Sequence, residues 1–76
     1  MDKEQLKSAI EAILFASGDP VPVQRIALVL DSDSDTVFAA GQELAEEYER
    51  NGRGIRLVRL NESLQLHSAP EFSLEI

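Results

Sequence analysis

The stretch EEYERNGRGIRL, residues 46–57, joins a segment rich in carboxylates to one that carries arginines. Asn51 and Gly52 form a typical helix stop, because glycine readily adopts the left-handed conformation that closes the C-terminal end of a helix. The residues IRLVRL that follow are branched and aliphatic over the length of a strand. We therefore predict that a helix ends here and a β-strand begins, with opposite charges on the two sides of the junction.

Three amphipathic helices are predicted before this junction. The first spans Lys3 to Ser17, where apolar residues recur at three- and four-residue spacing, and Gly18 ends it. The segment GDPVP is predicted to be a turn, and Pro22 suits the first turn of a short second helix that runs to Leu30. The acidic run DSDSD, residues 31–35, caps a third helix, because short oxygen-bearing side chains accept hydrogen bonds from its first amides.

A β-hairpin is predicted after the junction. LQLHS, residues 64–68, alternates between apolar and polar residues, and only Asn61, Glu62 and Ser63 separate it from IRLVRL. Asn61 is the residue of this connection that best tolerates a positive φ angle. The order of three helices followed by a hairpin predicts an α+β fold, the winged helix, as a single domain over residues 1–76.

The composition restricts the functions that this chain can have. An apolar fraction of 43% with three phenylalanines and one tyrosine indicates a small domain with an aliphatic core. The chain has no cysteine, which excludes disulfides, thiolate catalysis and cysteine-ligated zinc. The apolar runs AILFA and IALVL are too short to cross a bilayer, and the acidic start MDKEQ does not resemble a secretory signal. We expect a cytoplasmic protein that does not bind membranes.

No residue pattern predicts an enzyme. The aspartates of DSDSD have the spacing of the first ligands of an EF-hand loop, but Thr36 and Gln42 replace the glycine and the glutamate of such a loop. His67 is the single histidine, and no nucleophile elbow or phosphate loop accompanies it. We therefore predict no catalytic residue, no cofactor and no metal.

Winged helices commonly bind DNA, with one helix in the major groove and the hairpin on the backbone. Arg50, Arg53, Arg56 and Arg59 would make such contacts here, and DNA binding is the alternative function. The net charge of −7 opposes it, because the third helix would press its carboxylates against phosphates. We favour pairing within the chain, between Arg50 and Glu46 one turn back and between Arg56 and a glutamate or glutamine across the hairpin.

Four apolar residues lie outside the predicted inward-facing stripes of the helices, and they are Phe15, Leu28, Val29 and Phe38. A single exposed apolar residue is ordinary on a protein surface. Four of them on so small a domain predict an interaction surface, because burying each large side chain contributes about 1.5–3 kcal/mol. We predict that these residues form the contact of a homodimer.

Three stretches resemble the amino-terminal domain of the bacterial segregation and condensation protein B family. They are AIEAILFASGDPVPVQRIALVL at 9–30, ELAEEYERNGRGIRLVRL at 43–60 and LQLHSAPEF at 64–72. The resemblance implies a non-enzymatic subunit of a condensin-type complex that acts in chromosome condensation and segregation. It also implies a homodimer that binds the kleisin subunit, and through it the structural-maintenance-of-chromosomes ATPase, at the nucleoid.

The chain also departs from what the family resemblance implies. Family members usually carry two winged-helix domains in tandem, so we expect this chain to be a truncated form in which the second domain is absent. That domain supplies part of the kleisin contact in the family. Gly41 replaces a larger aliphatic residue, and Phe38 and Leu28 stand where family members often have charged residues.

Overall fold

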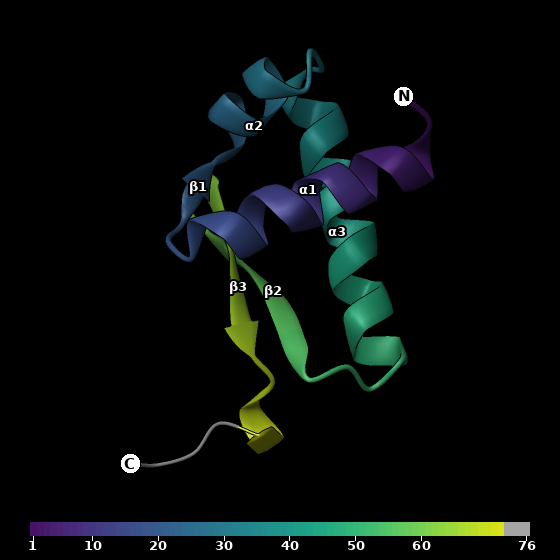
Figure 1. Cartoon of the computed structure of the whole chain (residues 1–76), viewed down its shortest axis with the longest axis vertical. Helices are drawn as coiled ribbons and strands as arrows, with labels where there is room; N and C mark the ends of the chain where they lie inside the picture. The colour runs from purple at the N-terminus through teal and green to yellow at the C-terminus, as the bar shows by residue number, and fades with distance from the viewer. Residues whose placement is uncertain (73–76) are drawn as a thin grey trace.

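The structure is a computed structural model, and it describes residues 1–72. Its elements in chain order are α1 (Lys3–Ser17), β1 (Val21–Pro22), α2 (Val23–Val29), α3 (Ser34–Arg50), β2 (Ile55–Leu60), β3 (Ser63–Ser68) and the 3-10 turn η1 (Pro70–Phe72). The strands form an antiparallel sheet in the order β1-β3-β2. Figure 1 shows α1 crossing α3, with the β2–β3 hairpin beside them. The predicted winged helix is confirmed.

The ends of α1 and α3 lie at or next to the residues that the sequence indicates, whereas α2 is one residue shorter at each end than expected. Asp2 caps α1 in a reciprocal capping box with Gln5, whose backbone N–H donates to Asp2 Oδ1 at 2.8 Å. Asp33 caps α3 and accepts a hydrogen bond from the backbone N–H of Thr36 at 2.7 Å, which lowers the pKa of the Asp33 carboxyl. Gly52 follows α3 with a φ angle of 60°, which confirms the predicted stop.

A short strand that the sequence analysis did not predict precedes α2. Val21 and Pro22 pair with Leu64 and Ser63 of β3, so part of the GDPVP segment is a third strand and not only a turn. Pro22 has φ and ψ angles of −60° and 136° and is the extended residue immediately before α2, so its predicted place in the first turn of that helix is wrong. Proline fits this strand because β1 lies at the edge of the sheet, where its missing N–H breaks no ladder.

The hairpin turn is shorter than the sequence predicts. Leu60 pairs with Ser63, so only Asn61 and Glu62 connect β2 to β3. Asn61 has a φ angle of 57°, which confirms the expected left-handed conformation. Ser63 is therefore the first residue of β3 and not the last residue of the turn.

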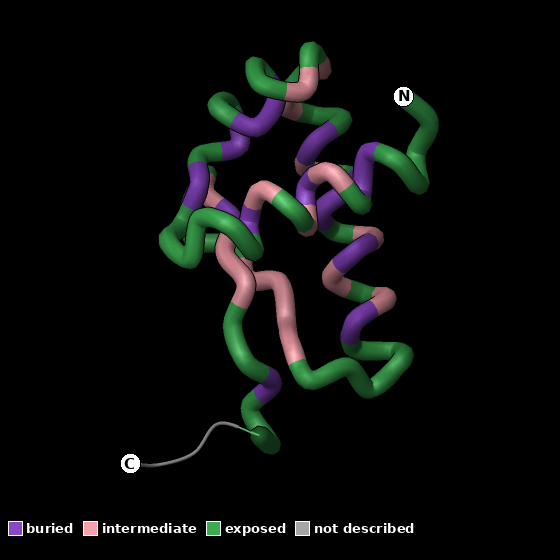
Figure 2. The backbone as a smooth tube through the Cα atoms, in the orientation of Figure 1, coloured by how far each residue is buried: buried purple, intermediate pink, exposed green. Residues whose placement is uncertain are grey.

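The core lies where the three helices and the inner face of the hairpin meet. Every residue of the predicted inward-facing stripe of α3 is buried, namely Val37, Ala40, Gly41, Leu44 and Tyr48. Ile10 and Leu14 of α1 and Ile26 of α2 are almost completely buried. Figure 2 shows buried stretches alternating with exposed ones along the helices, as amphipathic helices require. Within residues 1–72, none of the helices has both the length and the apolar character to span a membrane.

Gly41 allows α3 to lie directly against the sheet. A Cβ atom at this position would lie 3.1 Å from Leu64 Cδ1, closer than an ordinary van der Waals contact. Leu64 is 3% exposed and belongs to β3, the central strand. Glycine inside a helix costs about 1 kcal/mol relative to alanine. The close approach of α3 to β3 gives a physical reason for glycine at this position.

We predict that Gly41→Leu destabilises the fold by about 1–3 kcal/mol, because the buried Leu64 side chain, 3.1 Å from the added Cβ, has to shift within the core. The measurement is the free energy of unfolding in urea. Ala39→Leu, on an exposed position of the same helix, is the control and should change that free energy by less than about 0.5 kcal/mol. Equal stability of Gly41→Leu and the wild type would contradict the close approach.

Candidate protein-interaction surfaces

The four residues predicted for a dimer contact differ in exposure. Phe15, Leu28 and Val29 are 81%, 82% and 65% exposed. Phe38 is half-buried, and the Arg59 guanidinium lies over its ring with Cζ at 4.3 Å from the ring centre. Three of the four side chains are therefore free to contact another molecule, while Phe38 is partly engaged within the chain.

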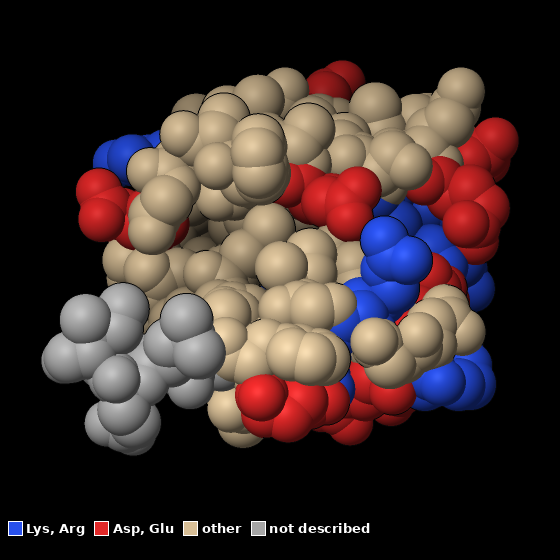
Figure 3. Space-filling view, turned by 60° about the horizontal axis from the view of Figure 1, so that its bottom comes forward, with Lys and Arg blue, Asp and Glu red and all other residues tan. Residues whose placement is uncertain are grey.

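Phe15 stands beside a shallow apolar depression between α1 and the hairpin. Two adjoining hollows of about 240 Å³ and 330 Å³ both have Phe15, Ile55 and Leu66 in their lining. Ile55 and Leu66 are half-buried and contribute apolar surface there. Figure 3 shows a broad uncharged region on the forward face of the molecule, with a hollow in it and charged residues at its edges. We call Phe15, Ile55 and Leu66 the Phe15 surface.

A separate hollow of about 290 Å³ lies between α3 and β2. We call it the α3–β2 groove, and its lining residues are Phe38, Ala39, Gly41, Gln42, Ala45, Glu46, Glu49, Leu57, Arg59 and Leu64. Phe38 belongs to this groove and Phe15 belongs to the other surface. That all four apolar residues join in one dimer contact stays a prediction.

Two of the four arginines are engaged by groups of the same chain. Arg56 Nη2 lies 3.5 Å from Glu71 Oε2, and Arg56 Nη1 donates a hydrogen bond to the carbonyl oxygen of Arg53 at 2.6 Å. Its neighbour across the hairpin is His67, so the expected glutamate or glutamine at that position is wrong. Arg59 lies over Phe38. The prediction that Arg56 pairs with a carboxylate is therefore correct, but the carboxylate is that of Glu71, which follows β3.

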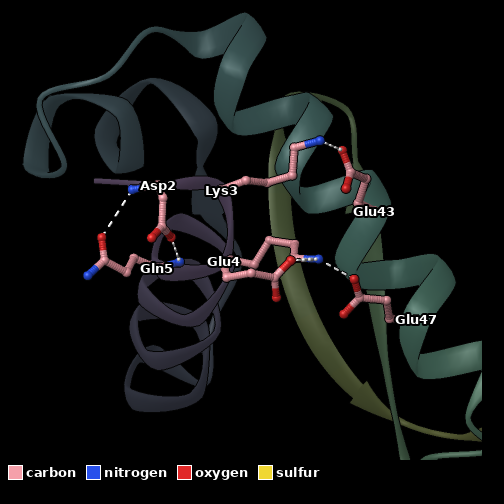
Figure 4. Close-up of polar contacts among 7 residues, drawn as sticks. Asp2, Lys3, Glu4, Gln5, Glu43 and Glu47 are labelled. Atoms are coloured by element: carbon pink, nitrogen blue, oxygen red, sulfur yellow. Dashed lines mark hydrogen bonds and ion pairs between the residues drawn. The ribbon is translucent and has the colours of Figure 1, made fainter.

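The helices α1 and α3 are joined by ion pairs. Lys3 Nζ lies 3.1 Å from Glu43 Oε2, and the Lys7 ammonium donates to Glu47 and lies 3.0 Å from Glu4 Oε2 (Figure 4). The Lys7 side chain is only 5% exposed, and a buried ammonium is costly without a partner. The two carboxylates compensate this charge. These contacts occupy the α3 carboxylates that face α1.

Two further carboxylates of α3 remain unpaired. Glu46 and Glu49 are exposed, line the α3–β2 groove and form no ion pair within residues 1–72. The predicted pairing of Arg50 with Glu46 is therefore wrong. One side of α3 is compensated by lysines, and the side next to β2 keeps its negative charge.

The residues considered for chemistry have structural roles or lie on the surface. Asp33 of DSDSD caps α3, and His67 is exposed, with Nε2 at 2.7 Å from Gln65 Oε1. In the described part of the chain, no three His, Asp or Glu residues are grouped so that they could hold a metal ion. The features that remain for function are the two apolar surfaces and the distribution of charge.

A sequence model described as "Segregation and condensation complex subunit ScpB" matches residues 8–76. The chain belongs to this family. Segregation and condensation protein B of Syntrophotalea carbinolica is 46% identical over 71 residues, and that of Alkaliphilus oremlandii is 38% identical over 71 residues. Each match covers 93% of this chain, but only 36% and 38% of the two relatives. This chain therefore spans less than two-fifths of the relatives' length.

Two solved ScpB structures have the same fold. ScpB from Mycobacterium tuberculosis superposes with a TM-score of 0.89 at 26% identity, over 95% of this chain and 45% of that one. A dimer of a ScpB N-terminal domain complexed with a ScpA peptide superposes with a TM-score of 0.83 at 35% identity. That match covers 90% of this chain and 85% of the other. The family resemblance of the sequence is confirmed by these comparisons.

Two buried side chains between α1 and α3 hold their protons more tightly than in an unfolded chain. Hydrogen bonds to Glu47 and Glu4 raise the pKa of Lys7. Burial raises the pKa of Tyr48, as does the hydrogen bond that its hydroxyl donates to Glu11 at 2.5 Å. Their protonated forms therefore stabilise the packing of α1 on α3.

We predict that the domain loses stability as the pH rises above about 10. The stabilisation from Lys7 and Tyr48 is complete below their ordinary pKa values of 10.5 and 10.0, and it is lost as the pH rises through the higher folded values. The free energy of unfolding in urea, measured from neutral to alkaline pH, should fall less steeply for Tyr48→Phe. Gln42→Met, at an exposed position of the same helix as Tyr48, is the control. Identical slopes for wild type and Tyr48→Phe would contradict this role of the Tyr48 hydroxyl.

Proposed function

We propose that this chain is a non-enzymatic interaction module that forms a homodimer and binds the ScpA-type kleisin subunit. Through that subunit it would join a structural-maintenance-of-chromosomes ATPase and act in chromosome condensation and segregation, in the cytoplasm at the nucleoid. The likeness to the ScpB N-terminal domain that forms a dimer with a ScpA peptide supports the proposal most directly. Because that match covers 85% of the other chain, a domain of this size suffices for both contacts in the relative.

The shape of the Phe15 surface supports a contact between two copies. In a twofold contact the same surface of each copy meets the other, so a projecting residue next to a depression is self-complementary. The Phe15 ring of one copy enters the depression beside Ile55 and Leu66 of the second copy, and the reverse contact forms at the same time. Each buried phenylalanine contributes about 1.5–3 kcal/mol, a large amount for so small a domain.

The other residues proposed for self-contact are placed less favourably. Leu28 and Val29 are exposed at the end of the short helix α2, and Phe38 is partly covered by Arg59 in the groove. The Phe15 surface combines an exposed ring with an adjoining depression. We therefore place the centre of the self-contact at Phe15.

DNA binding through α3 and its neighbouring arginines stays the alternative, and the charges give it little support. The exposed side of α3 presents Glu46 and Glu49, which would repel phosphates, and Arg56 is engaged by Glu71. Under the alternative, duplex DNA would bind the wild type at low salt, binding would weaken steeply with added salt, and Arg53→Glu would reduce it.

We predict that Phe15→Glu converts a dimer into a monomer, because two carboxylates would be buried in the twofold contact. Light scattering on a size-exclusion column gives the mass, and circular dichroism checks that the helices persist. Phe72→Glu is the matched control, since it makes the same change at a phenylalanine that is 60% exposed and lines neither hollow, and it should stay dimeric. A monomeric wild type at high concentration would overturn the dimer. A dimeric Phe15→Glu would overturn the placement at Phe15.

A further inference from the structure

We propose that the α3–β2 groove is the site that binds the kleisin-type peptide. Its occupant is a short ScpA segment that presents bulky apolar side chains flanked by lysine or arginine. The inference rests on the proposed function, because it places on this chain the partner named there. Three properties of the groove support it: the shape of its floor, the unpaired charges at its rim and its separation from the Phe15 surface.

The floor of the groove is apolar, and Leu57 is its half-buried part, while Leu64 and Gly41 are buried. Leu57 and Leu64 of the hairpin lie opposite Gly41, and the short side chains of Ala39 and Ala45 form part of the helical wall. The hollow of about 290 Å³ is at the lower limit of the roughly 300–1,000 Å³ that small-molecule pockets occupy. It therefore suits a few side chains of a peptide better than a cofactor. Apolar side chains in such a groove give affinity through the surface that they remove from water.

The rim of the groove selects the charge of the peptide. Glu46 and Glu49 lie three residues apart on α3, which places them next to each other on one side of the helix. Both are exposed and without an ion pair in residues 1–72, unlike Glu43 and Glu47 on the side towards α1. Uncompensated carboxylates beside an apolar floor favour a segment that carries cationic side chains next to its apolar ones.

The opposite wall carries one cation. Arg59 lies over Phe38, and its Nε donates a hydrogen bond to the carbonyl oxygen of Asn61 at 2.9 Å. Arg59 is exposed, so its guanidinium has N–H donors left for an incoming carboxylate or carbonyl group. The groove is therefore negative along α3 and positive at β2. This polarity orients a peptide with its basic residues towards α3.

The groove and the Phe15 surface are built from different residues. The lining of the groove and the linings of the two hollows beside Phe15 share no residue. A peptide in the groove therefore leaves Phe15, Ile55 and Leu66 free for a second copy of the chain. The two contacts can be disrupted separately by substitution.

The test measures binding of this chain to purified ScpA from the same genome by isothermal titration calorimetry. Glu46→Lys/Glu49→Lys reverses the charge of the rim, and Ala45→Arg fills the groove. Both variants should weaken ScpA binding by about tenfold or more, because like charges across an interface are strongly unfavourable. Asp19→Lys/Glu62→Lys makes the same change in net charge at exposed positions outside the groove and should bind as the wild type does. The dimer mass of every variant should be unchanged.

The outcomes separate this inference from the proposed function. No binding of ScpA to the wild type contradicts the proposed function itself. Wild-type affinity in both groove variants overturns the groove as the site and leaves the proposed function standing. Loss of ScpA binding in Phe15→Glu alone places the peptide on the self-contact and also overturns the groove. An equal loss in Asp19→Lys/Glu62→Lys would mean that net charge, and not the groove, controls binding.

Discussion

The contact between Gly41 and Leu64 determines how α3 lies on the sheet. Leu64 belongs to the central strand, which pairs with β1 on one side and with β2 on the other. Because Gly41 has no side chain, the Leu64 side chain packs directly against the helix at this position. Phe38 meets Arg59, and Ala45 faces the space above Leu57. Gly41 and Leu64 both line the α3–β2 groove, so this contact forms part of the surface of the groove.

The acidity of the chain has two physical roles. On one side of α3, Glu43 and Glu47 pair with Lys3 and Lys7 and hold α1 against α3. A lysine as buried as Lys7 keeps its charge only with such partners, so these carboxylates are part of the fold. On the other side the carboxylates have no partner in the described chain and face solvent beside apolar surface. The net charge of −7 alone does not reveal this division.

A domain of this size cannot cover all of its apolar side chains. The exposed apolar residues include Phe15 on α1, Leu28 and Val29 on α2 and Phe72 in η1, while Phe38 on α3 is half-buried against the core. The fold therefore presents more than one apolar surface, and two that share no residue suit a module with two partners.

The local sequence specifies the three helices and the two strands of the hairpin. The bounds of α1, the cap of α3 and the positive φ of Asn61 follow from interactions between residues close in the chain, which periodicity and turn chemistry predict. Only the tertiary structure decided that Val21 pairs with Leu64, that Arg56 meets Glu71, and that Phe15 and Phe38 line different surfaces. These features join segments that are distant in sequence, and they depend on which faces of the helices and the sheet meet in space.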